Sequence, residues 1–252
     1  MSDVKYENLV LRRTGDYDTY AVVYCSKNAT EVRIPSQIDG IAVTEIADNA
    51  FEECGMLLSV EFEEPTEEVL MSGNYFSKIG EYAFSYCTNL VSIDIPSSVC
   101  SIGRGAFFHC ESLKIASFSS DAYVGSYAFS ECEALEKVPL MTCISEGVFS
   151  GCEKLAAVKL GEGLFEIEES AFEDCAELVE ITIPKSVKRI DQLAFRGCYN
   201  LEKVKFEDIN GWFVRIRYNG STHALDLSDE KDVARELSMM DFDDGVDCWF
   251  KN

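Results

Sequence analysis

Cysteine is the residue type in this chain with the widest chemical range. The 252 residues include 11 cysteines but only two histidines, His109 and His223. Cysteine catalysis needs a base within hydrogen-bond reach of the thiol, and His109 stands directly before Cys110. Cysteine-rich metal sites use pairs such as Cys-x-x-Cys, and the sequence contains no such pair. We therefore predict no metal and no cofactor, with a cysteine-dependent enzyme as a remote alternative, and we expect His223 in an exposed loop.

Seven of the cysteines share one sequence context, which argues against catalysis. Each lies three residues after a phenylalanine and three residues before a leucine. These cysteines are Cys54, Cys87, Cys110, Cys132, Cys152, Cys175 and Cys198. Their Cα–Cβ bonds are expected to run parallel from repeat to repeat, whereas a disulfide needs them to converge. We expect a column of buried, reduced thiols that act as small apolar side chains, with the Cys110 sulfur turned away from any substrate.

The segments that carry these cysteines recur along the chain. Their phenylalanines are separated by 33, 23, 22, 20, 23 and 23 residues, and they are Phe51, Phe84, Phe107, Phe129, Phe149, Phe172 and Phe195. The L-x-x-V-x-I part alternates with period two and predicts one short strand per repeat, ended by a proline such as Pro96 or Pro184. The A-F-x-x-C part spaces apolar residues by three and predicts a helical or 3₁₀ turn. Because so short a unit cannot bury its own apolar face, the repeats must stack.

The full motif, A-F-x-x-C-x-x-L-x-x-V-x-I-P, resembles the BspA-like class of leucine-rich repeats met in bacterial surface proteins. The resemblance covers Val32 to Phe206, with seven full repeats and one N-terminal half-repeat. It implies an α/β solenoid, that is, a right-handed coil with a parallel sheet of short strands, short helical or 3₁₀ turns, and a cap at each end. For many members it also implies adhesion or host-surface interaction. The fourth repeat departs from the motif because Pro139 stands inside its strand.

Three segments follow from this pattern: an N-terminal cap hairpin over residues 1–30, repeats over 31–206, and a C-terminal cap over 207–252. Leu9–Leu11 and Tyr20–Tyr24 flank a turn signal and predict a hairpin that covers the first repeat. Caps are needed because a bare terminal repeat exposes both its core and a strand edge. Two capped ends lead us to expect a monomer.

The C-terminal cap is expected to contain a helix and a returning strand. Ser228 is expected to N-cap the helix, which carries Val233, Leu237 and Met240 on one face. Val246–Phe250 is expected to return as the strand.

Two acidic segments raise the question of calcium. Asp241–Gly245 lacks the alternating acids, the sixth-position glycine and the final glutamate of an EF-hand loop. Glu166–Glu177 carries its acids between inward-facing Ile167 and Phe172, so those acids must point outward. We interpret both segments as solvated surface.

The amino-acid composition limits which classes of partner the protein can bind and in which cellular compartment it is expected. With 22 basic and 45 acidic side chains the net charge is −23, which disfavours nucleic acid and anionic membranes. No apolar run reaches the roughly 18 residues of a membrane span, and residues 1–8 lack the pattern of a signal peptide. The resemblance implies a cell-surface or secreted protein. The unpaired cysteines favour a reducing compartment and make a cytoplasmic location the alternative.

Alternation along each predicted strand identifies the side chains that face outward. The charged ones are Glu31, Arg33, Glu61, Asp94, Lys137, Lys159, Glu180, Lys203 and Lys205. Five are basic and four are acidic, so this face is near neutral on a strongly acidic chain, and its C-terminal half is basic. We expect Lys137, Lys159, Lys203 and Lys205 to contact an acidic protein or glycan.

A second candidate contact surface is the long interval between the first two of the seven phenylalanines, which exceeds the common interval by ten residues. The extra length includes Glu63–Tyr75, and loops of this kind often carry recognition. Val69, Leu70 and Met71 are expected either to contact a partner or to tuck back against the solenoid, as buried apolar side chains usually do.

These features predict a non-enzymatic protein-interaction module. Its sheet face is expected to bind a protein or glycan, as part of a bacterial surface or secreted adhesion or recognition protein. The alternative is a cytoplasmic scaffold or regulator with the same fold.

Overall fold

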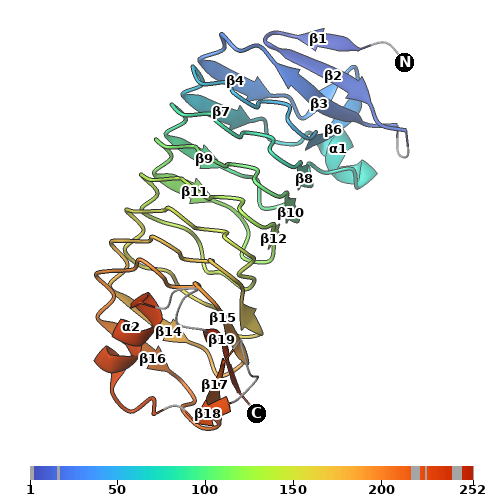
Figure 1. Cartoon of the computed structure of the whole chain (residues 1–252). Helices are drawn as coiled ribbons and strands as arrows, with labels where there is room; N and C mark the ends of the chain where they lie inside the picture. Colours follow the sequence, from blue (N-terminus) through green and yellow to red (C-terminus); the bar gives the residue numbers. More distant parts are fainter. Residues whose placement is uncertain (1–2, 16–17, 217–221, 225, 240–245, 252) are drawn as a thin grey trace.

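The computed structural model describes residues 3–15, 18–216, 222–224, 226–239 and 246–251. Its repeats stack one on the next along a single axis, with the N-terminal strands at one end and helix α2 at the other (Figure 1). Two ladders of short parallel strands run along the stack, and the apolar side chains of the repeats form one continuous core.

The first ladder contains the strands that the L-x-x-V-x-I pattern predicts. Four of them are parallel neighbours in the order β4 (Glu31–Ile34), β7 (Ser59–Phe62), β9 (Ser92–Asp94) and β11 (Ile115–Ser117). Nearer the C-terminus, β14 (Glu180–Ile183) pairs in parallel with β16 (Lys203–Phe206). Burial alternates as expected: in β4, Val32 and Ile34 are buried while Glu31 and Arg33 are exposed.

Between these two groups of strands the first ladder is reduced to isolated bridges. Lys137 pairs with Ile115, and Ala157 pairs with Glu180, but neither Lys137 nor Ala157 lies in a strand. Pro139 explains the first gap, because proline has no N–H to donate to a ladder. The prediction of a strand in every repeat is therefore wrong for the fourth and fifth repeats.

The second ladder lies on another side of the stack, and the prediction of a single strand per repeat missed it. Its parallel neighbours are β6 (Ile41–Ile46), β8 (Lys78–Ile79), β10 (Ser101–Ile102) and β12 (Tyr123–Val124), followed after a gap by β13 (Glu166–Ile167) paired with β15 (Arg189–Asp191). Each strand contains the aliphatic residue five positions before a phenylalanine. Most are two residues long, and a strand that short shows no alternation for a sequence pattern to reveal.

The A-F-x-x-C segments form hydrogen-bonded turns, as expected, but these turns are not helical. In the third repeat the Cys110 N–H donates to the Phe107 carbonyl at 3.1 Å, and the Leu113 N–H donates to the Cys110 carbonyl at 2.9 Å. Within the first of these turns His109 has a φ of 57°, in the left-handed region, which excludes a right-handed helical turn there. The chain therefore changes direction at each turn and closes the repeat.

The seven phenylalanines form a continuous stack through the core. Phe107 lies between Phe84 and Phe129, with ring centroids 5.2 and 5.1 Å away and interplanar angles of 3° and 5°. Around Phe149 the centroid distances to its two neighbours widen to 5.9 and 5.8 Å. The stack is thus loosest where both strand ladders are interrupted.

The cysteines of the motif do more than fill space. Each thiol from the second repeat to the seventh donates a hydrogen bond to the phenylalanine carbonyl of the preceding repeat, at 3.0–3.3 Å. The same carbonyl accepts the N–H of its own cysteine, as Phe129 does from Cys132 at 3.3 Å. None of the eleven cysteines, all of which lie in the described part of the chain, forms a disulfide, and the seven of the motif are buried. The prediction that these thiols act as small apolar side chains is correct about their burial but omits the hydrogen bond that each thiol donates.

A matched pair of substitutions tests the donor. Threonine and valine have nearly the same shape, so Cys152→Thr and Cys152→Val differ mainly in whether a group can donate to the Phe129 carbonyl. We expect the threonine variant to be more stable by about 1 kcal/mol, because it keeps one hydrogen bond to a buried carbonyl. Urea unfolding followed by circular dichroism measures the difference. If the valine variant is the more stable, the cysteine serves only as an apolar spacer.

The N-terminal strands extend the second ladder. Strand β1 (Val4–Tyr6) pairs antiparallel with β2 (Leu9–Arg13), and β2 pairs antiparallel with β3 (Tyr20–Cys25). Strand β3 pairs in parallel with β6. The short β5 (Gln37–Ile38) pairs with the start of β6. The two segments expected to form a hairpin are therefore paired, and they cover the edge of β6.

The C-terminal strands cover the other end of the second ladder. Strand β19 (Val246–Lys251) lies antiparallel between β15 and β17 (Trp212–Ile216), and β17 pairs with β18 (Thr222–Ala224). His223 lies in β18, so the prediction of a loop there is wrong.

Helix α2 (Glu230–Met239) buries Val233 and Leu237, as the apolar pattern predicts. Its first turn is capped by Asp229, whose carboxylate accepts the N–H groups of Lys231 and Asp232. The expected cap, Ser228, instead donates its own N–H to Asp226. Met240 and the segment 241–245 lie outside the described residues.

Candidate partner-binding surface

The nine charged side chains expected to face outward from the first ladder are all exposed. We call the surface they share the sheet face. Strand register places Arg33 beside Glu61, Glu180 beside Lys203, and Thr182 beside Lys205. Lys137 and Lys159 occupy the interrupted segment between the two groups of strands.

The sheet face is divided electrostatically along its length. In its N-terminal part the Arg33 guanidinium is neutralised by Glu63, 3.2 Å away, and by Glu61, 4.0 Å away. The Ser117 hydroxyl bonds to the Asp94 carboxylate.

The C-terminal part carries unneutralised positive charge. Within the described part of the chain, no hydrogen bond or ion pair engages the ammonium groups of Lys137, Lys159, Lys203 and Lys205. The N-terminal part of the sheet face therefore favours a cationic partner, and the C-terminal part favours an anionic one.

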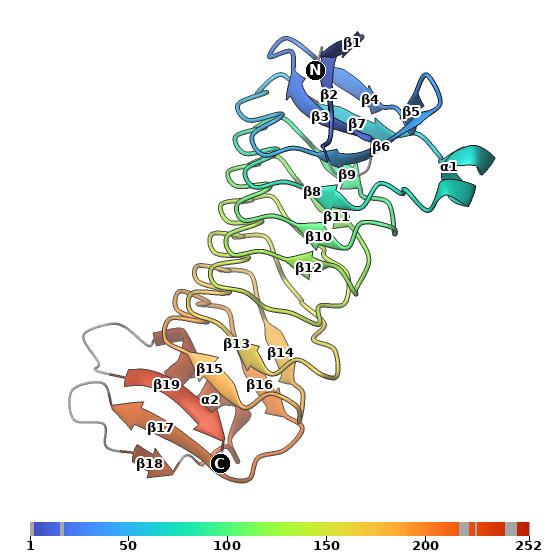
Figure 2. The ribbon, with the colours of Figure 1, turned by 90° about the vertical axis from the view of Figure 1, so that its right-hand side faces the viewer.

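A hollow lies beside the acidic part of the sheet face, where the first-ladder strands end. It has a volume of about 1030 Å³, and we call it the strand-end groove. Its lining comes from the residues at and after the ends of β4, β7, β9 and β11, together with the insertion and Val43 of β6. The insertion contains α1 (Glu67–Ser72), which stands out from the side of the stack (Figure 2).

The insertion is held at several points. The Thr66 hydroxyl accepts the N–H of Val69 and caps α1, while Gly73 ends the helix with a φ of 73°. The ring of Phe76 packs edge-on against Phe62, with centroids 5.1 Å apart. The Phe76 carbonyl accepts the Ser98 hydroxyl at 2.6 Å. The groove wall is thus tied to two neighbouring repeats.

The three apolar residues of the insertion have different environments. Val69 is buried, with 3% of its surface exposed, so this residue tucks back as one alternative predicts. Leu70 lines the groove and is 47% exposed, whereas Met71 is 86% exposed and does not line it. The insertion therefore both packs on the repeats and presents apolar surface.

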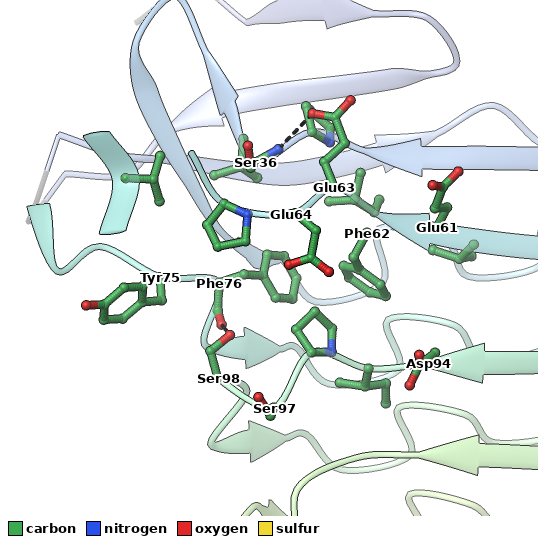
Figure 3. A pocket seen from close by; sticks show the side chains of 18 of the residues that line it. Ser36, Glu61, Phe62, Glu63, Glu64, Tyr75, Phe76, Asp94, Ser97 and Ser98 are labelled. Atoms are coloured by element: carbon green, nitrogen blue, oxygen red, sulfur yellow. Dashed lines mark hydrogen bonds between the residues drawn. The ribbon is translucent and has the colours of Figure 1, made fainter. Parts of the chain in front are cut away.

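Acidic groups surround this apolar surface. Glu61, Glu63, Glu64 and Asp94 are among the lining residues, and none of the lining residues is basic. Glu63 accepts the Ser36 N–H at 3.3 Å as well as pairing with Arg33 (Figure 3). Glu64 extends toward the middle of the hollow, and in the described part of the chain its carboxylate has no hydrogen-bond or ion-pair partner.

The sequence pattern did not predict this groove, although it predicted that two of its acids, Glu61 and Asp94, face outward and that the insertion is a candidate contact surface. The lining residues come from four repeats, and only the register of the strands brings them together. The length of the insertion was the one signal available.

The cysteine and histidine that suggested catalysis are not arranged for it. Cys110 is fully buried, its thiol donates to the Phe84 carbonyl at 3.2 Å, and burial raises its pKa well above the usual range for a thiol. The His109 ring stacks on Tyr86 at 5.0 Å, and its Nδ1 lies 3.9 Å from Glu111. Across the described residues, no group of three or more histidine, cysteine, aspartate or glutamate side chains is placed to hold a metal ion.

Comparison with known proteins agrees with the repeat pattern. The family model of the BspA type leucine rich repeat region matches six copies, over residues 44–146 and 125–213. No curated protein matches the chain.

Several solved structures are similar in fold. A leucine rich cell surface protein from Faecalibacterium prausnitzii A2-165 is 26% identical, with a TM-score of 0.68 over 88% of this chain and 60% of that protein. A T. pallidum leucine rich repeat protein is 25% identical, with a TM-score of 0.54 over 82% of this chain and 84% of that protein. The pneumococcal vaccine antigen PcpA, 22% identical over 91% of this chain and 55% of its own length, has a TM-score of 0.53 and shows the fold alone.

The chain thus spans about 60% of the length of the F. prausnitzii protein. The matched family segments cover more than half of this chain and contain most of the phenylalanine, cysteine and leucine columns. The chain belongs to the BspA-type leucine-rich repeat family.

Proposed function

We propose that this chain is a non-enzymatic interaction module that binds a protein or glycan through its sheet face. The observation that carries the proposal is the unneutralised positive charge of Lys137, Lys159, Lys203 and Lys205 on a chain of net charge −23. A stacked-repeat frame holds such side chains at set spacings, which lowers the entropy lost on binding. The partner that this part of the face fits is an acidic protein or an acidic glycan.

Location at a bacterial surface, in an adhesion or recognition role, is part of this proposal. It is supported by the F. prausnitzii protein, which is described as a cell surface protein. In the described part of the chain, no helix has the length and apolar character needed to cross a bilayer. A cytoplasmic scaffold is the second candidate, and eleven cysteines without a disulfide favour it. A single capped chain is the expected binding unit in either case.

A charge-reversal experiment tests the proposal. The four sheet-face lysines are changed to glutamate, and a control variant carries Lys5, Lys27, Lys185 and Lys231→Glu, which alters the net charge equally. Both variants are first checked for folding by circular dichroism. Wild type and variants are then used as baits against immobilised acidic polysaccharides, extracellular-matrix proteins and bacterial lysate.

We expect a partner retained by wild type and by the control but lost by the sheet-face variant. The source of that partner then distinguishes a surface role from a cytoplasmic one. Partners bound equally by all three baits would contradict sheet-face recognition.

A further inference from the structure

The strand-end groove has a chemical character different from that of the lysines on the sheet face. Its apolar lining residues include Phe62, Phe76, Ile95 and Phe118. Four carboxylate side chains and no cationic one are among its lining residues. Two more acids, Glu67 and Glu68, occupy the first turn of α1. A ligand that fits this groove must bring both apolar surface and positive charge.

The Glu64 carboxylate is the acidic group of the groove that is best placed to bind a cation. It points into the hollow and, among the described residues, no cation or hydrogen-bond donor engages it (Figure 3). Glu63, by contrast, is already satisfied by Arg33 and by the Ser36 N–H. Beside an apolar surface a carboxylate interacts more strongly with a cation than it would in open water. Glu64 is therefore the anchor that the groove offers to a cationic side chain.

The dimensions favour a polypeptide over a small molecule. The groove crosses the ends of four adjacent strands, which at about 4.8 Å per strand gives a length of ~14 Å. An extended chain rises about 3.3 Å per residue, so about four or five residues fill it. Alternate side chains of such a segment point to opposite sides, so a segment in which cationic and apolar residues alternate presents the two kinds as separate rows. A second copy of this chain is a poor occupant, because two molecules of net charge −23 repel each other.

We propose that the strand-end groove binds an extended segment of a partner protein in which lysine or arginine alternates with large apolar residues. Glu64 and Asp94 hold the cationic side chains, and Glu61, whose contact with Arg33 is the longer of the two Arg33 pairs at 4.0 Å, is shared between Arg33 and the ligand. Leu70 and Phe62 contact the apolar ones. This site is separate from the lysines of the sheet face, and it selects the opposite charge.

The test uses a defined peptide, because the natural partner is unidentified. The probe is a fluorescein-labelled, end-capped hexapeptide of alternating lysine and phenylalanine, and binding is followed by fluorescence anisotropy at two salt concentrations. We expect Glu64→Gln to weaken binding about fivefold. We expect the triple variant Glu64→Gln, Glu61→Gln and Asp94→Asn to weaken binding about tenfold or more relative to wild type. The matched control Glu180→Gln removes an exposed sheet-face carboxylate outside the groove and is expected to leave the affinity unchanged.

The apolar half of the proposal has its own matched pair. Leu70→Ser alters a residue that lines the groove, whereas Met71→Ser alters its exposed neighbour on the same helix. We expect Leu70→Ser to weaken binding about tenfold, as the loss of one apolar contact predicts, and Met71→Ser to have no effect. Both variants keep the Val69 anchor, and their folding is checked by circular dichroism.

Three results would overturn the proposal. One is equal weakening by Glu64→Gln and Glu180→Gln, which would mean that the peptide only senses overall charge. Another is equal affinity for a peptide with serine in place of phenylalanine, which would mean that positive charge alone suffices. The third is no binding at millimolar peptide.

A further measurement tests whether the groove binds independently of the sheet-face lysines. The variant with the four sheet-face lysines changed to glutamate is expected to bind the peptide at least as tightly as wild type. Loss of peptide binding in this variant would contradict two separate sites. If this variant still binds the peptide and also still binds the acidic partners of the wild type, the sheet-face proposal is refuted, whereas the groove proposal is not.

Discussion

Replacing Phe107 with alanine is expected to lower the free energy of unfolding by about 3–5 kcal/mol. The ring is fully buried and stacked between Phe84 and Phe129 at 5.2 and 5.1 Å. Its removal costs the transfer free energy of the side chain and leaves a cavity that the neighbouring repeats cannot fill, because their backbones are hydrogen-bonded to one another. Such a loss is a large share of the stability of an ordinary domain.

The next residue provides the control for this prediction. Phe108 is only partly buried and meets Tyr86 edge-on at 5.6 Å. We expect Phe108→Ala to cost about 1 kcal/mol, the contribution of one such aromatic pair. Urea titrations of both variants, followed by circular dichroism, give the comparison. Equal losses would mean that the stack contributes nothing beyond ordinary surface packing.

Replacing Gly103 with alanine is expected to destabilise the protein by about 1–3 kcal/mol, although it adds only a methyl group. A Cβ at this position would lie 2.6 Å from the Glu81 nitrogen and 2.6 Å from the Gly80 carbonyl carbon. These are backbone atoms, and no side-chain rotation relieves the clash. The Gly103 N–H also donates to the Ile79 carbonyl at 2.8 Å, so the two repeats cannot separate without losing that bond.

Gly55 is the matched control for this substitution. A Cβ there would meet only the Thr88 hydroxyl oxygen, at an ordinary contact distance of 3.4 Å. Gly55→Ala is expected to leave stability unchanged or raise it by about 0.4–1 kcal/mol, because alanine restricts the unfolded chain. Thermal unfolding of the two alanine variants measures the contrast. A similar midpoint for both would show that the repeats can shift apart and accept the methyl group.

Gly103 belongs to a column of glycines that recurs in register with the motif. Gly80, Gly103 and Gly125 each lie four residues before a phenylalanine of the motif. The structure gives the reason, since at each of them a Cβ would approach the backbone of the preceding repeat to within 3 Å. A column of glycines in register with an apolar motif therefore marks direct packing of backbone on backbone.

Some features of this protein followed from the sequence alone because they depend on side-chain periodicity. The phenylalanine, cysteine and leucine columns had to face inward, since no other apolar surface is available to bury them. The outward positions of the strands followed by alternation, and all nine charged residues at those positions are exposed. The pairing of β2 with β3 followed from two apolar runs around a turn signal.

Other features required the tertiary structure because they depend on contacts between repeats. The second ladder consists mostly of pairs of residues, and a pair becomes a strand only when a neighbour in the stack bonds to it. The hydrogen bond from each motif thiol joins two residues that lie 23 to 36 positions apart. The helix cap shifted from Ser228 to Asp229 through local geometry that spacing does not resolve.

The strand-end groove is the clearest case. Glu61 and Asp94 were identified as outward-facing residues, but nothing in their spacing predicted that they would meet Glu64 and the insertion around one hollow. That meeting is set by the parallel register of β4, β7, β9 and β11 and by the way Val69 and Phe76 dock the insertion. Periodicity along one chain determines which side chains leave the core. Only the stacking of repeats determines which of them become neighbours, because that distance is measured across the stack and not along the sequence.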